Sequence, residues 1–420
     1  MAECPAPFVV DPLAKPGSNL SINPALCRHG CCIPCPAQDL FYNDGWTVHA
    51  FLATDIVRFI SAIASFIILL SYLVLPDKRR HPSLLILNMA IAIFLFSMTV
   101  FFSIGNPNKL QCSGPINPST QDNNPLCAAQ GAILIFSSLA TCCWSAALIV
   151  NLHCHTVWNS NFFTHRYIAL NIICWGIPTA FMGAALGLHA VRFEFANLCL
   201  VSVSRIFELL FYPMAVIICP AFLLHIATFF YIARIAVREG LETDMSQSLS
   251  TGSNTGRSQA ARRHRHVITA VKIQWRALLL AIVSCGTVVF YWVREQAIYL
   301  QMLTLTLIPC PGQIFYFTQI HKMQRIGTDP TITTHWLECM LTADNNKNQN
   351  SCVYVISPHL PPFGLMITAE ALVSLCGVWV FLIFGKRSLW REWNDLIYDI
   401  RVTLGARGRV EKNGEQFFAL

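Results

Sequence analysis

Charged side chains are scarce in this sequence. Asp, Glu, Lys and Arg make up 12% of the 420 residues, whereas soluble domains contain about 25%. Hydrophobic residues make up 54% of the chain, and the mean hydropathy is +0.50. The shortage of charge argues against the two or three soluble domains that the length alone would allow. We therefore expect most of the chain to lie in a membrane.

Long apolar runs supply the expected membrane spans. A helix needs about 20 apolar residues to cross the roughly 30 Å hydrocarbon core. The runs lie at about 51–75, 82–104, 127–152, 166–189, 208–236, 272–293 and 361–384. Each is apolar on all sides, which is typical of helices embedded in lipid. The predicted fold class is an all-α membrane protein with a seven-transmembrane helix bundle.

The basic residues orient this bundle. Most of the 29 Lys and Arg fall in loops that are cytoplasmic when the N-terminus is outside, as the positive-inside rule requires. An eighth apolar stretch, about 297–317, contains prolines and a glycine. A span there would weaken the charge bias, so we expect an outer extension of the sixth helix followed by a loop.

We expect no signal peptide at the chain start, because MAECPAPFVV has no basic n-region and no sustained apolar h-region. We expect the first helix to act as its own insertion signal. Asn19 begins a glycosylation sequon on the expected outer side.

Three regions follow from this topology. We expect an extracellular cysteine-rich linker, the bundle, and an amphipathic helix with a cytoplasmic tail, at 1–50, 51–384 and 385–420. Within the bundle we expect a disordered inner loop at 237–268, because that stretch is rich in Ser, Thr and Gly, and a long outer loop at 294–360. After the last span, apolar residues recur at helical spacing, which predicts a helix lying in the inner interface. They are Leu389, Trp390, Trp393, Leu396, Ile397, Ile400 and Leu404.

Cysteines are plentiful, with 18 in the chain. The stretch CRHGCCIPCP, residues 27–36, is compatible with a zinc knuckle, a catalytic dithiol or a disulfide staple. Its expected position outside the membrane favours the staple, because oxidising compartments favour disulfides. The cysteines expected outside are odd in number, and Cys310 is our candidate for the unpaired one. Those inside spans, such as Cys219, are expected to act as small apolar residues.

Two stretches carry a resemblance to a receptor family. GCCIPCPAQDLF, followed by a span ending in LSYLVLPDKRRHPSLLIL, resembles the linker, first helix and first inner loop of Frizzled and Smoothened receptors. GVWVFLIFGKRSLW resembles their last helix and the Lys-Thr-x-x-x-Trp motif that follows it. Lys386 and Trp390 occupy that motif, with a spacing one residue shorter and Arg387 in place of Thr. The resemblance covers about residues 26–404.

The departures from that family are equally informative. The first 26 residues leave no room for the large cysteine-rich domain that binds Wnt, so the chain resembles a short, fungal or amoebal type. Rhodopsin-class hallmarks are absent as well, since the third span ends in NLHCHTVW and the seventh has no Asn-Pro-x-x-Tyr.

The resemblance implies a set of disulfides in the outer region. It implies Cys127 with Cys199, Cys339 with Cys352, Cys35 with Cys112, and Cys31 with either Cys27 or Cys4. Cys32 is an addition to the family pattern, and we expect it to pair with whichever of Cys4 or Cys27 is left.

The resemblance also implies an activation switch at the inner end. A basic residue low on the sixth helix, Arg276 or Lys272, would contact the inner end of the seventh, where Trp379, Lys386 and Trp390 lie. Outward movement of the sixth helix would then open a cleft for a G protein. The alternative is that both basic residues only reach the inner headgroups.

Charged residues inside the bilayer are costly and tend to be functional. Glu370, Asp55, Arg58 and His225 therefore form a candidate ligand pocket. A structural hydrogen bond is an equal alternative for Glu370, and a simple i,i+3 pair is the preferred reading of Asp55 and Arg58.

The predicted function is an orphan cell-surface receptor at the plasma membrane, with the N-terminus outside. Its expected partners are an unknown extracellular ligand and a heterotrimeric G protein, with membrane lipids or a sterol as further candidates and no nucleic acid. A receptor like the cyclic-AMP receptors of amoebae is the alternative. A transporter is less favoured, because internal repeats are absent. A seven-helix hydrolase is also less favoured, because it needs a zinc-binding cluster of His and Asp and the sequence shows no such cluster. We expect neither enzyme activity, nor a cofactor, nor a metal.

Overall fold

The structure is a computed structural model. It describes residues 4–13, 26–42, 46–79, 81–160, 162–250, 330–343, 351–360, 362–385 and 387–413. The expected sixth span at 272–293 and the apolar stretch at 297–317 lie outside the described residues. So do several residues singled out above, namely Asn19, Lys272, Arg276, Cys310 and Lys386.

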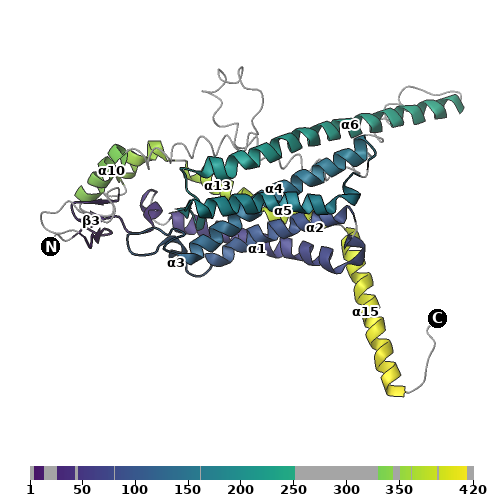
Figure 1. Cartoon of the computed structure of the whole chain (residues 1–420), viewed down its shortest axis with the longest axis horizontal. Helices are drawn as coiled ribbons and strands as arrows, with labels where there is room; N and C mark the ends of the chain where they lie inside the picture. The colour runs from purple at the N-terminus through teal and green to yellow at the C-terminus, as the bar shows by residue number, and fades with distance from the viewer. Residues whose placement is uncertain are drawn as a thin grey trace.

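Long helices run side by side and form the body of the molecule (Figure 1). They are α1 (Trp46–Val74), α2 (Ser83–Met98, continued by η3 at Thr99–Phe102), α4 (Pro125–Val157), α5 (Tyr167–Gly187) and α6 (Tyr212–Ser250, preceded by η5 at Phe207–Phe211). By length and composition these five are apolar enough to cross a membrane. They match the first five expected spans.

The start of α4 illustrates how the sequence sets a helix boundary. Asn124 precedes it in an extended conformation, and its side-chain oxygen accepts a hydrogen bond from the backbone N–H of Leu126. Pro125 occupies the first helical position, where its missing N–H costs nothing. An Asn cap followed by Pro is a strong local start signal.

The seventh span differs from the single helix expected at 361–384. It is split into α13 (Phe363–Ser374) and α14 (Cys376–Phe384), and the two apolar segments meet at an angle of 42°. The backbone N–H of Gly377 donates to Ser61 Oγ on α1 at 2.7 Å. A side chain on α1 thus takes a backbone donor of the seventh span, which is a recognised cause of helix kinks.

The stretch expected to be an inner loop also differs from expectation. α6 continues to Ser250, so the first part of the stretch expected to be disordered, 237–268, is helical. This segment contains Glu, Leu, Met and Gln, which are good helix formers. The prediction of disorder missed these helix formers, because it was based on the high Ser, Thr and Gly content of the whole loop.

Short strands and helices build the end of the bundle that is expected to lie outside. We call it the outer end and the opposite one the inner end. Strands β1 (Val9–Val10), β2 (Cys27–Arg28) and β3 (Cys31–Cys32) pair in the order β1-β3-β2. β4 (Val191–Phe195) and β5 (Leu198–Val201) form an antiparallel hairpin. Short helices complete this end: η1 (Ala37–Leu40), α3 (Asn108–Gln111), α10 (Pro330–Thr342), α12 (Val353–Ile356) and η6 (Ser357–His359).

Opposite ends of the molecule differ in what they carry (Figure 1). β3 and α10 lie at one end of the bundle. At the other end α6 extends past its neighbours, and α15 (Arg387–Asn413) leaves at an angle. Two short helices, η2 (Pro76–Arg79) and η4 (Phe162–His165), form the turns between α1 and α2 and between α4 and α5.

Of the buried apolar clusters in the described part of the chain, three are large. An inner-end cluster surrounds Trp144 and contacts Leu389 of α15. An outer-end cluster packs the β4–β5 hairpin against α4. A third packs Phe8 and Ile33 of the N-terminal segment against Trp336 of α10. This third cluster packs the N-terminal segment against the helices α10 and α12.

Candidate functional site

Disulfides hold the outer end together. The structure pairs Cys4 with Cys31, Cys27 with Cys32, Cys35 with Cys112, Cys127 with Cys199, and Cys339 with Cys352. All four cysteines of residues 27–36 are therefore bonded, and none is left as a thiolate for zinc or for a CxxC dithiol. Of the two pairings left open for Cys31, the structure has the one with Cys4.

Free thiols occur within the spans, as expected, at Cys142, Cys143, Cys174 and Cys376. Cys219 differs from expectation, because it is disulfide-bonded. Its position in an apolar span gave no indication of this.

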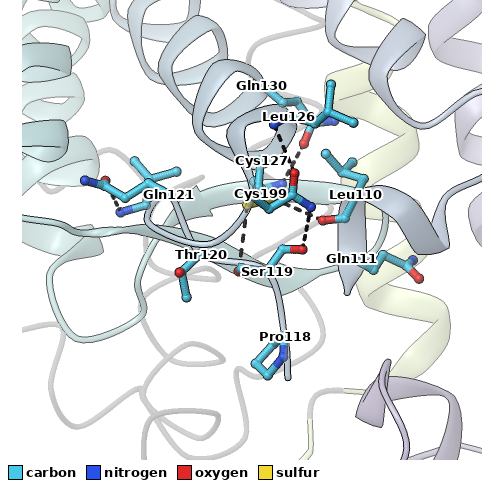
Figure 2. Close-up of a disulfide and its surroundings, with 12 residues drawn as sticks. Leu110, Gln111, Pro118, Ser119, Thr120, Gln121, Leu126, Cys127, Gln130 and Cys199 are labelled. Carbon is cyan, nitrogen blue, oxygen red and sulfur yellow. Dashed lines mark hydrogen bonds between the residues drawn. A yellow bond between two sulfur atoms is a disulfide. The ribbon is translucent and has the colours of Figure 1, made fainter. Parts of the chain in front are cut away.

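The disulfide between Cys127 and Cys199 fixes the hairpin to α4 (Figure 2). Next to it, the backbone N–H of Cys199 donates to Gln130 Oε1 at 2.7 Å. The contact is tight: a Cβ placed on Gly131 would lie 2.3 Å from Val191 Cγ1. Glycine is therefore required on α4 for this close approach of β4.

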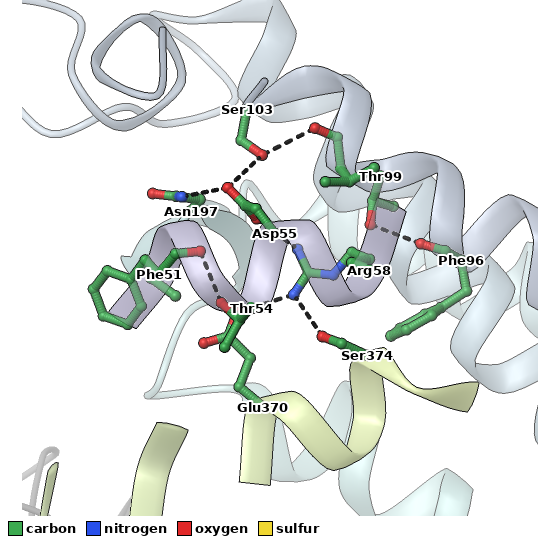
Figure 3. Close-up of polar contacts among 12 residues, drawn as sticks. Phe51, Thr54, Asp55, Arg58, Phe96, Thr99, Ser103, Asn197, Glu370 and Ser374 are labelled. Atoms are coloured by element: carbon green, nitrogen blue, oxygen red, sulfur yellow. Dashed lines mark hydrogen bonds and ion pairs between the residues drawn. The ribbon is translucent and has the colours of Figure 1, made fainter. Parts of the chain in front are cut away.

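Arg58 stands at the centre of a buried polar cluster (Figure 3). It is only 1% exposed. Its Nη2 donates to Glu370 Oε1 at 2.9 Å and to Ser374 Oγ at 3.3 Å, and its Nη1 lies 3.6 Å from Asp55 Oδ1. Thr54 Oγ1 also donates to Glu370, at 3.3 Å. The cluster joins α1 to α13.

The hairpin turn enters the same cluster. Asn197, which follows β4, donates from Nδ2 to Asp55 Oδ2 at 2.6 Å. Ser103 donates to the same oxygen at 3.3 Å. One carboxylate oxygen of Asp55 thus already accepts two hydrogen bonds from other parts of the chain (Figure 3).

The structure brings together three of the four candidate pocket residues. The expected i,i+3 pair of Asp55 and Arg58 is present, but Glu370 is the closer partner of Arg58. His225 lies on α6, one turn before Thr228, whose hydroxyl is 2.8 Å from His153 Nδ1 on the inner half of α4. His225 is therefore separate from the cluster.

Sequence reasoning named these charged residues but missed the pairing of Arg58 with Glu370. Arg58 was paired only with Asp55 and Glu370 was left without a charged neighbour, although the cost of an unpaired charge in a membrane was a signal that the two meet. Asn197 carried no such signal, because an Asn in an outer loop is ordinary.

Of the expected switch residues, the structure describes Trp379 and Trp390. Trp390 is 49% exposed, so its ring does not pack into the bundle. The neighbouring Trp393 does: its Nε1 donates to Ser71 Oγ at 2.9 Å. Lys78 and Glu392 form a further bond at 2.8 Å. Trp393, rather than Trp390, thus attaches α15 to α1.

A cavity of about 140 Å³ lies between the linker and strand β4. Most of its lining is apolar, and the main apolar residues are Ile33, Phe41, Ile116, Phe193, Phe195 and Leu360. Gln38 and Glu194 add polar groups. Burial raises the pKa of the Glu194 carboxyl, and the Arg192 guanidinium paired with it opposes part of that rise. An apolar cavity of about 150 Å³ can hold benzene, so this one suits a single small ring.

Known proteins resemble this chain over most of its length. Residues 44–358 match the model of the Frizzled/Smoothened family membrane region. An Aspergillus fumigatus protein named G protein-coupled receptor gprM is 25% identical over 402 residues, which is 93% of this chain and 76% of that protein. Frizzled and smoothened-like protein K of Dictyostelium discoideum is 30% identical over 116 residues, 27% of this chain and 20% of that protein. The family match includes Asp55, Arg58 and Asn197 but ends before Glu370.

Proposed function

The chain belongs to the Frizzled/Smoothened family of membrane receptors, and on that premise we propose that it carries an extracellular signal across the plasma membrane to a heterotrimeric G protein. The observation that supports this best is the contrast between its two ends (Figure 1). One is covered by disulfide-bonded segments. The other presents the extended α6 and the helix α15.

The disulfide-bonded end suits the extracellular side. Disulfides persist in oxidising compartments and are rare in the cytosol. The N-terminus would therefore be outside. An epitope tag before Cys4 should be stained on intact cells, whereas a tag after residue 420 should need permeabilised cells. The reverse pattern would contradict the orientation.

The cavity between the linker and β4 is our proposed contact for the ligand. Its size and apolar lining favour one small apolar or aromatic group. A screen of small compounds and peptides, read as G-protein activation, would identify the ligand. Ala37→Phe should fill the cavity and abolish the response, whereas Ala129→Phe, at an exposed position of α4, should retain it.

The switch at the inner end is proposed to work through the sixth helix. Arg276 or Lys272 would contact Trp379, Trp390 or the segment around Lys386 and hold the inactive state. A cation over an aromatic ring is worth about 0.5–2 kcal/mol, which corresponds to roughly 2- to 30-fold in an equilibrium. The exposed ring of Trp390 is available for such a contact.

Basal signalling tests the switch. Arg276→Ala should raise basal G-protein output in a cell reporter at equal surface expression, because the inactive state loses its contact. Arg401→Ala, which removes an exposed arginine of α15, is the matched control and should leave the output unchanged. Unchanged or lower output from Arg276→Ala would reject the switch.

A further inference from the structure

The buried polar groups at the outer end form one continuous path. It begins at the linker, passes through the hairpin turn and ends where the seventh span is broken. The residues along it are Gln38, Ala196, Asn197, Asp55, Arg58, Glu370 and Ser374. Its steps come from four separate segments of the chain.

The path begins with Gln38 in η1, which is 4% exposed. Its Nε2 donates to the carbonyl of Ala196 at 3.1 Å, and its Oε1 accepts from the N–H of Ala196 at 2.9 Å. This side chain thus binds the turn at two points. Three residues earlier, Cys35 is disulfide-bonded to Cys112. The linker that holds the turn is therefore itself held covalently.

Two further glutamines also donate hydrogen bonds to the turn. Gln111 Nε2 donates to Ala196 O at 3.1 Å and to Asn197 Oδ1 at 2.7 Å. Gln130 Nε2 donates to Asn197 O at 3.0 Å. Ala196 has a φ of 58°, a left-handed conformation that alanine rarely adopts. The three glutamines hold the turn in a shape that its sequence does not favour.

Asn197 connects the turn to the helix bundle. It is 6% exposed, and its side-chain oxygen is used by Gln111, so its Nδ2 faces Asp55. A hydrogen bond to a carboxylate is stronger than one between neutral groups. No other contact in the path joins the hairpin turn to α1 through a charged group.

The path then reaches the seventh span. Asp55 lies beside Arg58, which binds Glu370 and Ser374 of α13. Ser374 is the last residue of α13, and the break follows at Leu375. A shift of the hairpin turn would therefore alter contacts of Ser374, one residue before the break.

We propose that Asn197 is a positioning residue that couples the disulfide-bonded linker to the break in the seventh span. Its amide holds Asp55, Asp55 helps to hold Arg58, and Arg58 holds the end of α13. When Asn197 loses this contact, the segment around Leu375 opens more often. This coupling goes beyond the proposed receptor function and needs neither ligand nor G protein.

Cys376 provides a direct probe, because it carries a free thiol next to the break. The experiment measures N-ethylmaleimide alkylation of each free cysteine in the purified full chain by peptide mass spectrometry. Asn197→Asp places a second carboxylate against Asp55. We expect Cys376 to react about tenfold faster, the change that loss of one hydrogen bond to a charged group produces in a local opening equilibrium. Buried Cys142, Cys143, Cys154 and Cys174 should react at unchanged rates.

Two matched variants separate coupling from general damage. Asn117→Asp makes the same charge change at an exposed loop position and should leave Cys376 unchanged. Combining Asn197→Asp with Asp55→Asn exchanges the amide and the carboxylate. The hydrogen bond between the two positions returns although Arg58 loses its Asp55 carboxylate, so alkylation of Cys376 should be slower than in Asn197→Asp alone. If Asn197→Asp does not fold, Asn197→Ala removes the donor without adding charge and should give a smaller rise, about threefold, at Cys376 alone.

Three results would overturn the proposal. One is equal alkylation of Cys376 in the Asn197 and Asn117 variants. Another is a uniform rise at every free cysteine, which would mean that Asn197 only stabilises the fold. The third is no recovery in the exchanged pair.

Discussion

The outer and inner ends of this bundle are held by different forces. At the outer end, disulfides and side-chain amides fix the backbone of the β4–β5 hairpin. At the inner end, apolar side chains around Trp144 fill the core, and α15 adds Leu389 and Trp393. Hydrogen bonds are directional, whereas apolar burial is not. The difference favours one fixed geometry at the outer end and a freer inner end, which the proposed signalling to a cytoplasmic partner would need.

The largest expected effect comes from the buried cluster at the outer end. Arg58→Met leaves Asp55 and Glu370 buried without their cationic partner, which should cost about 3–5 kcal/mol. Lys78→Met removes the inner-end partner of Glu392, where the pair is partly solvated, and should cost about 0–1 kcal/mol. Thermal unfolding with a thiol-reactive dye compares the two. Equal shifts in melting temperature would remove the contrast between the ends.

The disulfides of the outer end should differ among themselves. Cys127 and Cys199 are 72 residues apart, whereas Cys27 and Cys32 are 5 apart. Loop-closure entropy predicts a loss of about 4 kcal/mol when the first pair is changed to Ser and about 2 kcal/mol for the second. Melting temperatures of the two double variants should rank in that order. A larger loss from the short loop would mean that local packing, not loop closure, dominates.

A smaller effect is expected where α15 joins the inner end. Trp393→Phe keeps the ring but loses the hydrogen bond to Ser71, which should cost about 1 kcal/mol. Trp390→Phe changes a half-exposed ring and should stay within about 0.5 kcal/mol. The same melting assay measures both. If Trp390→Phe were the more costly change, the attachment of α15 would have been assigned to the wrong residue.

The smallest expected effect is a pH dependence at the hairpin. Burial raises the pKa of Glu194 above its ordinary value of 4.5, so the folded state binds this proton more readily than the unfolded state. The resulting stability is fully present below pH 4.5 and is lost as the pH rises through the raised value. Glu194→Gln should remove this part of the pH dependence. Parallel stability curves for the two proteins from pH 4.5 upward would contradict the burial of this carboxyl.

Much of the fold was predictable because hydrophobicity acts locally. Twenty apolar residues in a row have few alternatives to a span, and the first five predicted spans match α1, α2, α4, α5 and α6. The break at Leu375 was not predictable, because it depends on a hydrogen bond between Ser61 and Gly377, which are far apart in sequence. The helical extension to Ser250 was missed because composition was averaged over the whole loop.

The candidate site was predictable only in part, for the same reason. Charges within apolar runs identified Asp55, Arg58 and Glu370, but their partners depend on which helices pack together. Asn197 reaches Asp55 only because the disulfide and the three glutamines hold the hairpin turn over α1. No local pattern in the sequence encodes that placement.

Hydrogen exchange on the reconstituted chain tests the central contrast most directly. The full-length protein in nanodiscs would be compared with and without nucleotide-free heterotrimeric G proteins, and deuterium uptake would be mapped by peptide. We predict that a coupling heterotrimer changes uptake in the inner parts of α6 and α15 and leaves the β4–β5 hairpin protected. Uptake that changes only at the hairpin, or in no peptide with any heterotrimer, would contradict the account.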